Sequence, residues 1–321
     1  MWICILTLTF LIGQFFLHNN FTKDALLNFS RHIFPLLMLF FFRETKNKNS
    51  LILLNFFEIL LTINAIFILA GFFFKIPLAE TYTYGSRFGY NGFFINSTTG
   101  SYVCLVGLIH FILKYKKRLF KQIHFLVFLI SLFLVGTKII YLSIVMLGFF
   151  YLHYYVKLKF KKPLYILLLT LGALGFFIAF FKIGIFNEIR QDKGLFSAIF
   201  SFRNELLFND TIPYIKENWT FINYLFGGVE DFKLRSEFGF IDVFFFFGIV
   251  GGIIYLYLFY KAFVTFDLNK KNSIILLYLL VIIFVAGNFF SYATLPIYIL
   301  ILRESFNIYS KKNIYITNTS I

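Results

Sequence analysis

The chain has 321 residues, of which 60% are hydrophobic and only 14% are charged. Its mean hydropathy is +0.81. A soluble domain of this size needs more charge to cover its surface, so the composition excludes a soluble globular protein and predicts an all-α polytopic membrane protein. The net charge of +15 does not indicate nucleic-acid binding, because the lysines cluster in short segments between apolar runs, as cytoplasmic anchors of membrane helices do.

Ten apolar runs follow one another, and we expect about ten transmembrane helices in a single membrane domain over residues 1–321. The first run lacks the basic flank and cleavage site of a signal peptide, which favours a retained helix. Some runs are shorter than the roughly 20 residues that a span needs and must use flanking residues. The runs lie at about 2–17, 29–42, 51–74, 92–113, 122–136, 139–156, 163–186, 239–260, 273–290 and 292–309.

The basic residues predict the orientation. Seventeen of the thirty lie in alternate loops and near the C-terminus, at 43–48, 114–121, 157–162, 261–271 and 311–312. The positive-inside rule places these segments, and both termini, in the cytoplasm. The opposite segments are then extracytoplasmic, namely 18–28, 75–91, the turn at 136–138, the long loop 187–238 and Ser291.

The loop 187–238 holds eight of the fifteen acidic residues. Residues 195–208 predict an amphipathic helix at the membrane interface, with Arg203 among its apolar residues. One interpretation is that Arg203 extends its charged end to the membrane interface. The other is that it binds a buried anionic partner, because a guanidinium can donate two parallel hydrogen bonds to a phosphate. A second short helix is expected from residues 209–211 to Trp219. A turn at 227–228 then returns Glu230, Asp231 and Arg235 to the membrane.

Two further basic side chains are expected on the same side of the membrane. Arg87 lies among glycines and tyrosines, which indicates either a ligand-binding loop or an ordinary interfacial aromatic belt. Lys138 follows a turn between two closely spaced apolar runs, where it either reaches the interface or lines a cavity. Asn91 and Asn96 extend polar character into the next run, so we expect that helix end to face a cavity.

An acidic residue inside a membrane helix is costly without a partner and is therefore a candidate site residue. Asp242 begins the eighth apolar run, preceded by Glu237, and Arg235 would share its helix face if the helix began near residue 235. Glu58 in the third run is a weaker candidate of the same kind. His32 is expected near the extracytoplasmic side and His110 near a cytoplasmic helix end, and no histidine has metal-ligand spacing.

Several segments together resemble the bacterial O-antigen and capsular polysaccharide polymerase family, which is related to the O-antigen ligases. SRFGYNGFFIN at 86–96 is similar to that family's arginine- and glycine-containing stretch after an early periplasmic loop. GTK at 136–138 is similar to its short turn between two spans. SFR at 201–203, Trp219 and LFGG at 225–228 resemble its large loop, although serine and phenylalanine precede Arg203 where a glycine is usual. Glu237, Asp242 and GIVG at 248–251 resemble the next helix.

The resemblance implies a glycosyltransferase of the bacterial plasma membrane that joins undecaprenyl-diphosphate-linked oligosaccharide units at the extracytoplasmic face, without a metal or cofactor. It implies that basic residues hold the diphosphate, and the matching positions are Arg87, Lys138 and Arg203, with Arg235 nearby. Asp242 and Glu237, together with Arg203, are the catalytic candidates. Its partners would be membrane lipids and the chain-length regulator and flippase of the same pathway.

Two alternatives stay open at this stage. An O-antigen ligase-type transferase would carry a histidine at the start of the helix after the large loop, where this sequence has Glu237 and Asp242. A flippase or another carrier would carry charges midway across several helices and inverted repeats, and the sequence shows neither pattern.

Overall fold

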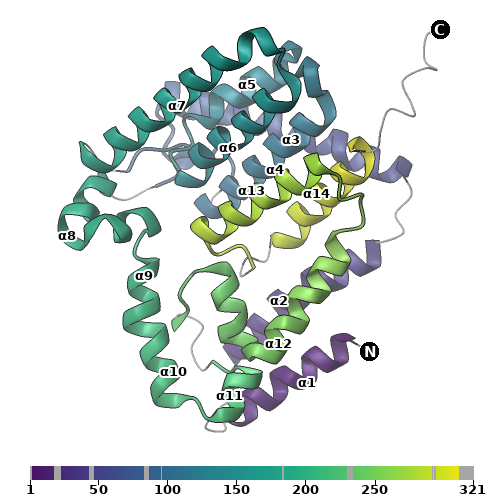
Figure 1. Cartoon of the computed structure of the whole chain (residues 1–321), viewed down its shortest axis with the longest axis vertical. Coiled ribbons are helices and arrows are strands. Elements are labelled where there is room, and N and C mark those ends of the chain that lie inside the picture. The colour runs from purple at the N-terminus through teal and green to yellow at the C-terminus, as the bar shows by residue number, and fades with distance from the viewer. Residues whose placement is uncertain are drawn as a thin grey trace. The chain divides into compact units, whose positions relative to one another are not determined.

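A computed structural model describes residues 2–17, 23–42, 47–82, 87–94, 96–182, 184–229, 234–290, 292 and 294–310. Within these ranges all repeating structure is helical, and one isolated bridge joins Glu80 to Tyr90. The long helices are α1 Trp2–Phe15, α2 Lys23–Phe41, α3 Asn47–Phe74, α4 Ser97–Tyr115, α5 Ile123–Leu132, α6 Lys138–Tyr155, α7 Leu158–Phe181, α8 Ile185–Phe200, α12 Gly239–Phe263, α13 Lys270–Ala286 and α14 Leu295–Tyr309. Figure 1 shows them along the chain.

Each of the ten apolar runs corresponds to one of these helices. Among the described residues, five helices are long and apolar enough to cross a membrane: α3, α4, α6, α7 and α12. The helices α1 and α5 are apolar but shorter. Some boundaries differ from expectation: α4 begins at Ser97 rather than near residue 92, and α7 covers Leu158–Phe181 rather than 163–186. In addition, α2 begins at Lys23, so residues 23–28 are helical rather than part of a loop. Asp24 in its first turn is favourable at a helix N-terminus.

The chain folds as two compact units. Unit 1 comprises Met1–Arg43, Leu171–Phe263 and Leu280–Pro296. Unit 2 comprises Glu44–Thr170, Val264–Leu279 and Ile297–Ile321. The candidate residues Arg203, Arg235, Glu237 and Asp242 belong to unit 1, whereas Arg87 and Lys138 belong to unit 2.

In unit 1, the helices α1 and α12 pack on each other, and the short helix α11 (Phe221–Phe226) packs against both (Figure 1). The backbones approach closely through glycines. A Cβ on Gly13 would lie 2.3 Å from the Phe226 carbonyl oxygen, and one on Gly248 would lie 2.3 Å from the Gly227 nitrogen. Gly248 has a φ of 68° and interrupts the helical conformation of α12. Gly227 and Gly248 lie in the two segments, LFGG and GIVG, that resemble the polymerase family. Because they have no Cβ, they allow the backbone of α11 to pack closely on α12.

Hydrogen bonds also hold α11 and the adjoining segments against α1 and α12. The Nδ2 of Asn223 donates to the carbonyl oxygens of Gly13 and Gly227, at 3.0 and 2.9 Å. The indole Nε1 of Trp219 donates to the Gly228 oxygen at 3.0 Å, and its ring stacks on Phe245. The turn expected at 227–228 is present, with a positive φ at both glycines.

The segment before α11 differs from expectation. The predicted helix 195–208 is interrupted, because α8 ends at Phe200 and both Ser201 and Phe202 have a positive φ. A new helical segment begins at Arg203 and continues without a break through a π-helical turn (Leu206–Thr211) into α10 (Ile212–Asn218). The helix start expected at 209–211 is therefore wrong, and the helix ends at Asn218, one residue before the end expected at Trp219. Thr211 points inward instead, donating to the Leu206 and Leu234 oxygens.

In unit 2, α3 packs on α4 and α5, and α4 packs on α6. Most side chains of α4 are buried, which makes it the centre of this unit. Asn96 caps α4, with its Oδ1 accepting from the amides of Thr98 and Thr99 at 2.9 and 3.1 Å.

Candidate functional site

Arg203 is held at the start of its helix by unit 1. Its side chain is 15% exposed, and its Nε lies 3.7 Å from the Oε2 of Glu237. Its Nη1 donates to the Phe200 oxygen at 3.2 Å. The αL conformation of Phe202 turns the chain so that Arg203 lies against Gly287, where a Cβ would lie 2.8 Å from the arginine Nε. The guanidinium is therefore fixed in position next to a carboxylate.

Glu237 occupies a constrained backbone position. Its φ is 63°, and its carbonyl accepts from the amide of Asn288 at 3.0 Å. A non-glycine residue in this conformation is uncommon and persists only where surrounding contacts hold it. The helix α12 begins at Gly239, where the eighth apolar run was expected to begin, so Arg235 precedes the helix and does not share a helix face with Asp242. The left-handed turn at Glu237 separates Arg235 from the helix.

Asp242 is buried in the first turn of α12, with 5% of its surface exposed. Its Oδ1 accepts from both the backbone amide and the hydroxyl of Ser236, at 3.0 and 2.7 Å. Its Oδ2 has no hydrogen-bond partner in the described part of the chain. The carboxylate is therefore oriented by one oxygen while the other remains available.

Arg235 acts electrostatically on this carboxylate. Burial lowers the pKa of Arg235, and the carboxyls of Asp242 and Glu237 oppose that change. The structure thus brings Arg203, Arg235, Glu237 and Asp242 into one polar cluster around residues 235–242, which we call the α12 cluster. Glu230 and Asp231, expected to return to the membrane with Arg235, lie outside the described residues.

Sequence reasoning missed one member of this neighbourhood. His32 on α2 is 2% exposed, and its ring stacks on Phe246 with centroids 5.0 Å apart and an interplanar angle of 9°. No histidine lies in the segment that leads into α12, so the sequence around Asp242 gave no indication that a histidine packs beside this helix. The one available hint was that His32 was expected on the extracytoplasmic side.

The segments that precede α4 and α6, which carry Arg87 and Lys138, pair with one another in unit 2. The amide of Tyr90 donates to the Leu134 oxygen at 2.7 Å, and a Cβ on Gly136 would lie 2.0 Å from the Phe88 oxygen. The turn expected before Lys138 is confirmed, and Lys138 is the first residue of α6. Residues 83–86 of the expected binding loop lie outside the described residues.

Arg87 lies over the ring of Tyr82, 4.7 Å from its centroid. Burial raises the pKa of Tyr82, and the charge of Arg87 opposes the rise. Polar residues near the N-terminal end of α4 also contact the α6 segment. The hydroxyls of Ser101 and Thr137 share a hydrogen bond of 2.7 Å between their oxygens.

Unit 2 contains another polar cluster. It surrounds Glu58, near the middle of α3, and we call it the Glu58 cluster. One carboxylate oxygen lies 2.9 Å from the Nε2 of His110. The other lies 2.8 Å from the Nζ of Lys114 and accepts from the hydroxyl of Tyr115 at 3.1 Å. His110 lies five residues before the end of α4 and is fully buried within the unit.

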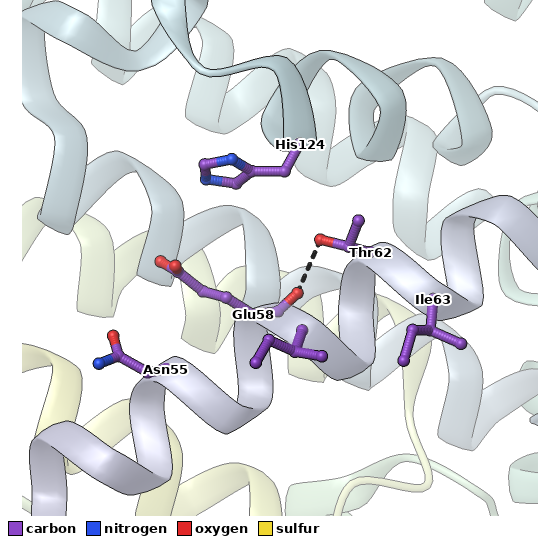
Figure 2. Close-up of a pocket in the computed structure, with 6 residues that line it drawn as sticks. Asn55, Glu58, Thr62, Ile63 and His124 are labelled. Carbon is purple, nitrogen blue, oxygen red and sulfur yellow. Dashed lines mark hydrogen bonds between the residues drawn. The ribbon is translucent and has the colours of Figure 1, made fainter.

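The proton positions in the Glu58 cluster follow from its bonds. Ser305 donates to the Ile301 oxygen, so its hydroxyl oxygen accepts from His110 Nδ1 at 2.8 Å. The contact between His110 Nε2 and Glu58 Oε1 then requires one shared proton. Glu58 and His124 line a hollow of about 370 Å³, together with Asn55, Ile59, Thr62 and Ile63. Figure 2 shows the labelled side chains of Glu58 and His124 from two different helices. His124 bonds to Tyr115 at 3.1 Å.

No group of three or more histidine, cysteine, aspartate or glutamate side chains in the described ranges could hold a metal ion. Comparison with protein-family models, curated proteins and solved structures found no match to this chain.

Proposed function

We propose that this protein is a polysaccharide polymerase that joins undecaprenyl-diphosphate-linked oligosaccharide units at the extracytoplasmic face of the bacterial plasma membrane. The observation that carries the proposal is the α12 cluster, where Arg203 and Arg235 lie with Glu237 and an oriented, buried Asp242 carboxylate. The resemblance of residues 86–251 to the O-antigen and capsular polysaccharide polymerases supports the same activity.

The reaction would transfer a glycan from its lipid diphosphate to a hydroxyl of the next lipid-linked unit. Negative charge develops on the departing diphosphate, and fixed guanidiniums such as those of Arg203 and Arg235 would stabilise it without a metal. The acceptor hydroxyl needs a base or a hydrogen-bond acceptor within reach, which Asp242 Oδ2 would supply. In unit 2, Arg87 and Lys138 match basic positions of the family that the sequence resembles, and they would bind substrate phosphate as well. We expect purified enzyme to retain its rate in EDTA.

This function requires a topology in which both termini are cytoplasmic, about ten helices span the membrane, and residues 187–238 are outside. The asymmetry of the basic residues supports it. Cysteines introduced at Asn218 and Asn269 test it with an impermeant thiol reagent. Labelling at 218 alone in intact spheroplasts is expected, and labelling at 269 alone would reject the topology.

Deletion of the gene tests the activity. Single repeat units should accumulate on the lipid at the extracytoplasmic face, and purified protein should extend such units into polymer. Accumulation of long lipid-linked chains would identify an O-antigen ligase-type transferase instead.

One observation favours a carrier such as a lipid-linked oligosaccharide flippase. Charged side chains of the Glu58 cluster lie within α3 and α4, and Arg303 and Glu304 are buried within α14. A carrier needs charges inside its helices. If the protein were a flippase, deletion would trap single repeat units at the cytoplasmic face.

A further inference from the structure

His32 carries a buried nitrogen without a partner. Its Nδ1 lies 2.8 Å from the backbone oxygen of Asn28, and since a carbonyl oxygen only accepts, Nδ1 carries the hydrogen. In the neutral ring Nε2 then bears a lone pair. No described residue donates to Nε2, although the residue is only 2% exposed. A buried acceptor without a donor costs free energy unless a ligand or water supplies the hydrogen.

The α12 helix relates this nitrogen to Asp242. Phe246, on which His32 stacks, lies four residues after Asp242 and therefore on the same face of the helix, one turn away. Arg235 acts electrostatically on both His32 and Asp242. Each of the two has one buried acceptor atom unused, His32 Nε2 and Asp242 Oδ2. Two buried acceptors, one on the first turn of α12 and one stacked on the next turn of the same helix face, suit a ligand that donates hydrogen bonds, and sugar hydroxyls do so.

We propose that His32 and Asp242 together bind the acceptor sugar through its hydroxyls, and that His32 Nε2 is the base of the transfer. The inference rests on the proposed polymerase function and names the acceptor site within it. The hydroxyl proton moves to Nε2 as the hydroxyl oxygen bonds to the anomeric carbon of the donor. The bond from that carbon to the diphosphate oxygen breaks, and its electron pair leaves with the diphosphate. Asn28 stabilises the resulting imidazolium through Nδ1–H.

The competing explanation is that His32 only fills the core. Phe247 and Tyr255 meet its ring edge-on, with centroids 5.4 and 5.6 Å away. The hydroxyl of Tyr255 is also buried without a partner in the described residues. It is the group within the protein that could donate a hydrogen bond to Nε2 in place of a ligand. The charged groups acting on the ring are Arg31, on its own helix, and Arg235. A packing role would be satisfied by any planar ring at position 32.

Three variants separate these explanations in the full-length protein, assayed in lipid with repeat units isolated from deletion cells. His32→Phe keeps the stacked ring but removes both nitrogens, and the loss of a general base should lower the rate by about 10²–10⁴-fold. His32→Gln keeps a hydrogen-bond acceptor, so KM for the acceptor should change little while kcat falls. The pH profile of the rate of His32→Gln should lack the inflection that titration of His32 causes in the wild-type protein. Tyr255→Phe should retain the rate, and His153→Phe is the matched control at an exposed histidine.

A measurement on the wild-type protein tests binding independently of activity. With ¹⁵N-histidine labelling, the Nε2 resonance of His32 should shift when the free oligosaccharide repeat unit is added, and the shift should be absent in Asp242→Asn. Wild-type rates in His32→Phe, or an unchanged pH profile in His32→Gln, would overturn the role as base. If His32→Phe fails to fold, His32→Gln decides. A protein that makes no polymer but shows the Nε2 shift would refute the polymerase and retain the sugar site, whereas no shift would overturn the site.

Discussion

Among the described residues, each unit buries a carboxylate and a histidine, Glu58 and His110 in unit 2 and Asp242 and His32 in unit 1, and the two sets differ in how completely their hydrogen bonds are made. In the Glu58 cluster, both carboxylate oxygens and both nitrogens of His110 have partners. In unit 1, Asp242 Oδ2 of the α12 cluster and His32 Nε2 have none among the described residues. Both carboxylates are largely buried, so burial alone does not distinguish a structural cluster from a binding site.

The difference indicates what each cluster does. A closed network orders the helices that contribute to it and leaves no atom for a substrate. An open one loses free energy until a ligand completes it, and such acceptors collect at functional sites. We therefore expect substitutions in the α12 cluster to affect catalysis, and substitutions in the Glu58 cluster to affect stability.

Asp242→Asn should give the largest effect. The amide is nearly isosteric and keeps one oxygen for Ser236, but it cannot act as a carboxylate, so we expect polymer formation to fall by about 100-fold or more. Thermal unfolding and diphosphate binding should change little. If Asp242 serves only as an ionic partner of Arg235, a double variant with Asp242→Arg and Arg235→Asp should recover polymer. That recovery would exclude a catalytic role.

Arg203→Ala and Arg87→Ala should each abolish polymer at normal protein levels, because each removes a guanidinium assigned to the diphosphate. Lysine at either position should rescue only in part, since it lacks the bidentate fork. The assay is polymer length on gels beside an immunoblot of the membranes. Full-length polymer in both alanine variants would refute the assignment.

Glu58→Ala should act on stability instead. Removing the carboxylate leaves Lys114 and His110 without their shared acceptor, and breaking a buried pair costs about 3–5 kcal/mol. A lower Tm of the purified protein is expected, with a near-normal rate per folded molecule. A stable variant that lost activity would place Glu58 in a substrate pathway and favour the carrier.

Gly248→Ala should show the smallest of these effects, confined to the docking of α11. The added Cβ meets the backbone near Gly227, and the positive φ disfavours alanine, so we expect a loss of about 1–3 kcal/mol in unfolding free energy. Gly175→Ala in α7 is the matched control, because nothing lies within 4 Å of its Cβ. Equal Tm values for the two variants would contradict the docking role.

The sequence by itself determined the helices, because each apolar run is continuous and its local pattern suffices to place it. It also singled out the residues of the α12 cluster, since a buried acid is conspicuous in an apolar run. It failed where a positive φ interrupts a predicted helix, as at Ser201 and Phe202, because neither serine nor phenylalanine is a residue type that favours such a conformation. Only tertiary packing brought His32 to Phe246 and His110 to Glu58, because partners so distant along the chain are chosen by how whole helices pack.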